Sequence, residues 1–237
     1  MYRLILEWSE VWAILIPLLI LLLKHNHSAS LKPIVWYLIC ALILNLTADL
    51  IRWHSWHNPT VSGFLKYNNW LYNCHSIVKT ILFVLFFKYA GNSSKWFNSK
   101  WIIITFLLFV ILNFLFFDNF FYISSHLFTV EGIVLLICCV SFFLRRLQDE
   151  ELYIEFDPPL IIATGLTIYE GINFFIFLFF NVLMKKEKGF AITIWDVHNI
   201  SFIIFCVFIA YAFYGRKNIN RNFNQSSHLR NPISNIG

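Results

Sequence analysis

LYNCHSIVKTILFVLFF, residues 71–87, is an apolar run long enough for a membrane-spanning helix, apart from two side chains near its start. His75 and Lys79 stand four residues apart, which places them on one face of a helix. A lysine inside a bilayer costs several kcal/mol unless another group compensates its charge. We therefore expect Lys79 to face the interior of a helix bundle and to pair with Glu131 or Glu170, which lie at similar depth.

The whole chain has the composition of an integral membrane protein. Of its 237 residues 59% are hydrophobic and 13% charged, about half of the charged fraction of a soluble domain. Seven segments are long and apolar enough to span a bilayer, namely residues 5–23, 34–53, 70–89, 101–117, 124–144, 159–183 and 192–214. We expect an all-α fold, with one seven-transmembrane helix bundle over residues 1–214 and a short disordered cytoplasmic tail over residues 215–237.

Basic residues in the predicted loops favour an N-out, C-in orientation. The inner loops and tail would hold Lys24, Lys32, Lys88, Lys95, Lys100, Arg145, Arg146, Arg216, Lys217, Arg221 and Arg230. The outer side would hold Arg3, Arg52, Lys66, Lys185, Lys186 and Lys188. The net charge of +5 follows largely from this cytoplasmic excess, so it does not indicate binding of nucleic acid.

Under this topology most polar residues of the spans fall in the outer half of the bundle or near the midplane. We expect a polar core or ligand site made from Asp49, Asn73, His75, Lys79, Glu131, Glu170, Asn173, Asp196, His198 and Asn199. Asp49, Glu131, Glu170 and Asp196 are acids, whereas Lys79 is the one obligate cation among them. Some of these acids must therefore be protonated, paired with histidinium or bound to a cation.

Three interpretations of this layer compete. The residues could be structural, forming hydrogen bonds between helices, or could form the floor of an outward-opening pocket lined by aromatic side chains. They could also bind a metal such as zinc, whose candidate ligands are His75, His126, His198, Asp49 and Glu131. No HExxH or similar spacing fixes such a site, and the sequence contains no GxSxG motif or P-loop. A catalytic function is therefore less favoured than binding.

One predicted cytoplasmic loop stands out as a candidate partner surface. LRRLQDEELYIEFDPP, residues 144–159, begins with two arginines and continues with five acids, among which Leu152, Ile154 and Phe156 alternate. Such a run is usually a solvated loop, but alternating apolar residues could also dock a partner.

Seven predicted helices, a polar outer layer, short loops and the segments NCHSIVKTILFVLFF (73–87) and AITIWDVHNI (191–200) together resemble the seven-transmembrane sensory regions of bacterial signalling proteins. More loosely they resemble small uncharacterised seven-helix membrane proteins of bacteria. The predicted outer polar pocket favours a receptor or sensor module that binds a small ligand from outside and signals to a separate cytoplasmic partner. The resemblance implies that it lies in the bacterial cytoplasmic membrane.

Two alternatives to a receptor stay open, and the sequence argues against a microbial rhodopsin. The alternatives are a metal-dependent integral-membrane lipid hydrolase and a structural polar core without a ligand. Seven-helix membrane hydrolases typically carry their site nearer the cytoplasmic face, whereas the polar layer predicted here is on the other side. Microbial rhodopsins bind retinal through a lysine of their last helix, and residues 192–214 contain no lysine, so we expect no retinal.

Overall fold

The computed structural model describes residues 2–24, 29–57, 68–91, 97–148 and 156–215. Within these ranges the chain forms eight α-helices and no strand. The helices are α1 (Tyr2–Glu7), α2 (Ser9–Leu23), α3 (Lys32–His57), α4 (Asn69–Tyr89), α5 (Ser99–Phe116), α6 (Ser125–Gln148), α7 (Pro158–Lys186) and α8 (Lys188–Tyr214), with a short 3-10 turn, η1 (Ala29–Leu31), before α3.

Six of these helices, α3 to α8, are long and apolar enough to cross a membrane, which indicates an integral multi-pass membrane protein. The first predicted span differs from the expectation, because the chain breaks at Trp8 between α1 and α2. The indole of Trp12 donates a hydrogen bond back to the carbonyl of Ile5 (2.9 Å) across this break. Helix α2 is apolar but has 15 residues, about 22 Å of helix.

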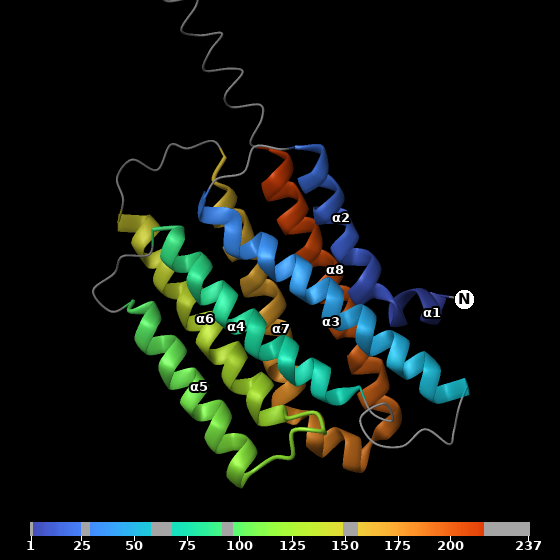
Figure 1. Ribbon diagram of the computed structural model, residues 1–237. Helices are drawn as coiled ribbons and strands as arrows, with labels where there is room; N and C mark the ends of the chain where they lie inside the picture. The colour runs from blue at the N-terminus through green and yellow to red at the C-terminus, as the bar shows by residue number, and fades with distance from the viewer. Residues whose placement is uncertain (1, 25–28, 58–67, 92–96, 149–155, 216–237) are drawn as a thin grey trace, which may run out of the picture.

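The helices form a ring in the order α2, α3, α4, α6, α7 and α8, and α2 closes it by packing against α8 (Figure 1). Helix α5 lies outside the ring, against α4 and α6. It is also the least buried of the six long helices, and Leu108 and Leu115 are among its exposed side chains. Apolar side chains on the outside of a ring suit a lipid environment, since the bilayer takes the place of water there.

The interior of the ring has two chemically different halves. The apolar half, where α8 ends, is filled by aromatic side chains such as Phe83, Phe87, Phe142 and Phe213. The polar half, where α8 begins, holds the charged residues buried in the ring, which are described below. This division into halves is the one expected from the positions of polar residues along the predicted spans.

The C-terminal ends of α2 and α8 lie together at the apolar half of the ring. Lys24, which follows α2, donates a hydrogen bond to the carbonyl of Tyr214, and its ammonium lies 3.7 Å from the centre of the Tyr214 ring. The predicted tail is outside the described residues from 216 onward, and so are residues 149–155 of the candidate docking loop.

Candidate functional site

Lys79 of α4 is buried between two carboxylates. Its ammonium lies 2.6 Å from Glu131 Oε1 of α6 and 2.9 Å from Glu170 Oε1 of α7. The three residues are 5%, 1% and 2% exposed. The prediction that Lys79 faces the interior and pairs with Glu131 or Glu170 is confirmed, and the structure shows both contacts instead of one. This charged triad ties three helices together.

Two neighbours complete the surroundings of the triad. Ser76, one turn before Lys79, donates a hydrogen bond to Glu131 Oε2. The ammonium of Lys79 also lies 4.7 Å from the centre of the Tyr169 ring, a distance at which a cation is attracted to an aromatic face. The Ser76 hydroxyl therefore supplies a hydrogen bond to the carboxylate oxygen of Glu131 that does not face Lys79.

A second polar cluster joins α2, α7 and α8. His198 Nε2 lies 3.2 Å from Glu10 Oε1, and His198 Nδ1 lies 2.5 Å from Asn173 Oδ1. The amide nitrogen of Asn173 donates to the carbonyl of Tyr169 (2.7 Å) and to Ser201 Oγ (3.2 Å). Because the amide nitrogen of Asn173 makes these two donations, its amide oxygen is the atom that faces His198. Each nitrogen of the imidazole therefore lies against an oxygen atom.

This geometry sets two oxygens against the two nitrogens of one imidazole. A neutral imidazole carries one N–H and can satisfy one of the two oxygens that His198 faces. The second contact therefore needs another proton, carried by the imidazole or by the carboxyl of Glu10. The triad of Lys79, Glu131 and Glu170 carries one negative charge when both carboxyls are ionised.

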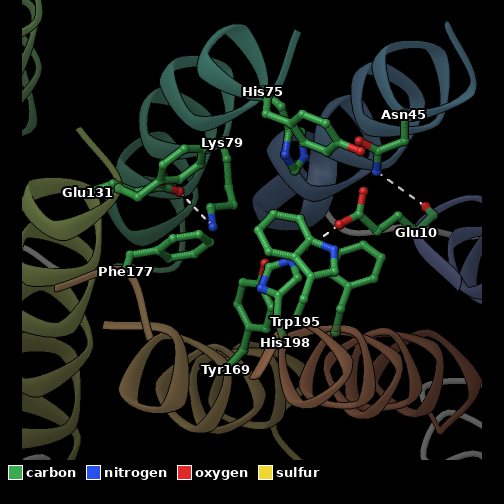
Figure 2. A pocket seen from close by; sticks show the side chains of 12 residues that line it. Glu10, Asn45, His75, Lys79, Glu131, Tyr169, Phe177, Trp195 and His198 are labelled. Atoms are coloured by element: carbon green, nitrogen blue, oxygen red, sulfur yellow. Dashed lines mark hydrogen bonds and ion pairs between the residues drawn. The ribbon is translucent and has the colours of Figure 1, made fainter. Parts of the chain in front are cut away.

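The two clusters face a common cavity of about 20 Å³, roughly room for one water molecule (Figure 2). Its polar lining comes from Glu10, Asn45, His75, Lys79, Glu131 and His198. Its aromatic lining comes from Tyr72, Phe128, Tyr169, Phe177, Trp195 and Phe202. Figure 2 shows these side chains converging from α2, α3, α4, α6, α7 and α8.

His75 points into this cavity one turn from Lys79 and is 9% exposed (Figure 2). Its Nε2 atom has no hydrogen-bond partner among the described residues. A buried polar atom without a partner costs free energy. The histidine therefore marks a side of the cavity where a bound group would gain a contact that the described residues do not supply.

The remaining predicted site residues, Asp49, Asn73, Asn199 and Asp196, do not line the cavity. Asp49 pairs with Arg52 (2.7 Å) on its own helix. Asn73 donates to the carbonyls of Phe120 and Tyr122 (both 2.8 Å), and Asn199 donates to the carbonyl of Leu6 (3.1 Å). These contacts hold the α5–α6 turn and α1 in place. Asp196 is half-buried and does not line the cavity.

A third polar cluster surrounds Asp118 in the turn between α5 and α6. Ser124 Oγ donates to Asp118 Oδ2 (2.5 Å), and so do Asn113 Nδ2 (3.4 Å) and the ring of His126 (3.1 Å). Partial burial raises the pKa of the Asp118 carboxyl, but these hydrogen bonds outweigh it and leave the pKa below its ordinary value.

The five predicted metal ligands do not form one site: His75, His198 and Glu131 line the cavity, whereas Asp49 pairs with Arg52 and His126 with Asp118. Glu131 is paired with Lys79 and His198 with Glu10, and the side chain of His126 is 62% exposed. The described ranges contain no group of three or more His, Cys, Asp or Glu residues that could hold a metal ion. These residues were predicted at similar depth along their helices, but their side chains do not all face the same part of the bundle.

Glu10, Asn45 and Tyr169 are site residues that the sequence analysis missed. For Glu10 a usable signal existed, since it is an acid next to an apolar run. Asn45 donates to the carbonyl of Glu10 (3.2 Å), and Tyr169 is buried beside Lys79. Neither position differs in sequence from an ordinary residue of a membrane helix, so no pattern would have found them.

No model of a known protein family, no curated protein and no solved structure matches the chain.

Proposed function

We propose that this chain is a receptor-type sensor of seven spans, whose polar half faces outward and takes a small ligand. Helix α2 is the seventh span, since it fills the place in the ring between α3 and α8. The excess of lysine and arginine at the opposite end favours an N-out, C-in orientation. By its architectural resemblance the chain would reside in a bacterial cytoplasmic membrane.

The observation that carries the proposal is the convergence of charge on one cavity. The triad of Lys79, Glu131 and Glu170 and the pair of Glu10 and His198 come from α2, α4, α6, α7 and α8. Charged groups in a membrane interior are costly and rare, and they usually mark a functional site. A ligand that alters this charge balance acts on nearly every helix of the ring at once.

A continuous series of packed rings leads from the triad to the far end of the bundle. Neighbouring ring centres are 5.2 to 6.2 Å apart along what we call the aromatic column: Tyr169, Phe205, Phe83, Phe86, Phe87 and Phe142. Lys79 lies over the first ring, and the guanidinium of Arg146 lies 5.3 Å from the last. Arg146 in turn pairs with Asp157 (3.0 Å).

The column ends where the proposed partner would bind. Arg146 and Asp157 lie on either side of residues 149–155, the middle of the candidate docking loop. A packed path becomes a coupling path only when a change at one end shifts the other. The proposal therefore requires that the charge state of the triad alters the surroundings of this loop.

The decisive experiment places a reporter at the far end of the column. An environment-sensitive fluorescent amino acid is incorporated at Gln148, the exposed last residue of α6, in the full chain in lipid nanodiscs. Glu170→Gln, which neutralises the triad without changing its shape, is expected to shift the emission. Glu187→Gln is the matched control, since this carboxylate is exposed at the α7–α8 junction.

Breaking the column should remove the response. With Phe87→Leu present, Glu170→Gln is expected to leave the emission at Gln148 unchanged. A folded Glu170→Gln protein that gives the same emission as the parent would argue for the alternative of a purely structural polar core. The alternative of a metal-dependent hydrolase has less support, because the described residues contain no group of three or more His, Cys, Asp or Glu residues that could hold a metal ion.

A further inference from the structure

We infer that the cavity beside His75 binds a small monovalent nitrogen cation, either an ammonium ion or the head of a short primary amine. The inference rests on the proposed function, since it names the class of ligand for the same site. Three features carry it: the charge of the triad, the unpartnered nitrogen of His75 and the aromatic lining of the cavity.

Charge excludes an anion and favours a single positive charge. Glu10 has His198 as its partner, and Asp49 pairs with Arg52. The triad then remains with two carboxylates against the one ammonium of Lys79. In an interior of low dielectric an uncompensated carboxylate is unfavourable, and a bound monovalent cation would restore neutrality.

The unpartnered His75 nitrogen favours a cation that carries N–H groups. When Nε2 is unprotonated it offers a lone pair into the cavity, which an N–H donor can use. Glu10 and Glu131, which also line the cavity, offer carboxylate oxygens as further acceptors. Alkali ions prefer a shell made of oxygen ligands, so they would gain less from an imidazole nitrogen.

The aromatic lining and the size of the cavity further restrict the class of ligand that can bind. Tyr169 and Trp195 present aromatic rings there, and rings of this kind attract ammonium groups. The protein already uses this chemistry once, where the Lys79 ammonium lies over Tyr169. A volume of about 20 Å³ suits a group the size of one water molecule, which is the size of an ammonium head.

The test measures thermal unfolding of the full chain in nanodiscs at constant ionic strength. Ammonium chloride is expected to raise the unfolding temperature in a saturable way, whereas sodium, potassium and tetramethylammonium chloride should not. Ligands that bind only the folded state raise its stability in this manner. Methylammonium chloride separates the two sources: a shift indicates that an amine head fits, and no shift indicates the free ion.

Variants assign the binding to this cavity. His75→Phe and Glu131→Gln are each expected to weaken ammonium binding at least tenfold, whereas His75→Gln, which keeps an acceptor, should retain part of it. His126→Phe is the matched control, because that histidine lies outside the cavity. Glu131→Gln should also unfold at an equal or higher temperature than the parent without ammonium, since it removes the surplus charge.

Two results would overturn the inference. Equal shifts from ammonium and potassium would show that N–H donors are not recognised, and full binding by a folded His75→Phe protein would place the site elsewhere. The proposed function fails separately: ammonium that stabilises the protein without changing the emission at Gln148 would leave a binding site without signalling. An emission response to Glu170→Gln in a protein that does not bind ammonium would support the proposed function and overturn the ammonium site.

Discussion

Glu10 Oε1 lies 3.2 Å from His198 Nε2, although the two residues are 188 positions apart in the chain. The contact joins the first helix of the ring to the last at the polar half, where α2 begins. Helix α2 is short and contains Pro17. Its place in the ring therefore depends on contacts with the neighbouring helices. Asn45, which donates to the carbonyl of Glu10, adds a second polar contact from α3.

We expect Glu10 and His198 to be energetically coupled. In a double-mutant cycle with Glu10→Gln and His198→Gln, the interaction term should fall in the range of about 0.5–3 kcal/mol, as for residues in direct contact. The measurement is the free energy of unfolding in detergent. As a control, Glu187→Gln combined with His198→Gln should be additive, since Glu187 is exposed. Additivity of Glu10 and His198 would show that the contact does not hold α2.

Lys79→Met should be strongly destabilising, because it leaves two buried carboxylates without their cation. Removal of one partner of a buried ion pair typically costs about 3–5 kcal/mol. A second substitution, Glu170→Gln or Glu131→Gln, should recover part of the loss, and the same unfolding measurement tests both cycles. The effect should be larger than that of Lys88→Met, which removes an exposed lysine from the end of the same helix. Equal effects of the two lysine substitutions would refute the charged triad.

The sequence predicted the helices well because apolar length is a local property. The segment predicted as 70–89 is α4, Asn69–Tyr89, and 192–214 lies within α8. The break at Trp8 was not predictable, since no glycine or proline marks it. Burial of Lys79 was predictable because a charge that faces lipid is costly whatever its neighbours are.

The partners of the buried residues were only partly predictable. Counting along a helix gives the depth of a side chain, but its neighbours depend on how each helix is rotated in the ring. His126 and Glu131 lie on one helix, yet one faces the α5–α6 turn and the other the centre. Glu10 reaches the site because α2 is placed next to α8, a relation between the two ends of the chain that no local pattern contains.

Two glycines of α7 should respond in opposite ways to alanine. A Cβ atom at Gly165 would lie 2.5 Å from Phe208 Cβ, which is fixed to the backbone of α8. Gly165→Ala must therefore push α7 and α8 apart and should be destabilising. At Gly171 a Cβ atom would meet nothing within 4 Å, so Gly171→Ala should be neutral or stabilising by up to about 1 kcal/mol. Unfolding temperatures of the two variants compare them directly, and equal losses would contradict the close contact of α7 with α8.

The C-terminus should lie in the cytoplasm. Lys24, Lys32, Arg145 and Arg146 flank the helix ends on the same side as the end of α8, and basic residues are retained on the inner side. A fusion after residue 237 to a reporter that is active only in the cytoplasm is expected to be active, and one that is active only outside should be silent. The opposite pattern would turn the cavity toward the cytoplasm and remove the basis for an external ligand.

Asp118 should make stability depend on pH in a defined direction. Because its pKa in the folded protein is below the ordinary value of 3.8, the unfolded chain takes up a proton first as the pH falls. The stabilisation from the ionised carboxylate is thus complete above the ordinary value and is lost as the pH falls through the pKa of the folded state. Asp118→Asn lacks this contribution at every pH. The parent should therefore have the larger free energy of unfolding at pH 6, and the difference between the two proteins should shrink between about pH 5 and pH 2. Unfolding measured across this range in detergent checks the difference, and a gap that is constant or widens toward low pH would show that Ser124, Asn113 and His126 do not stabilise the charged form.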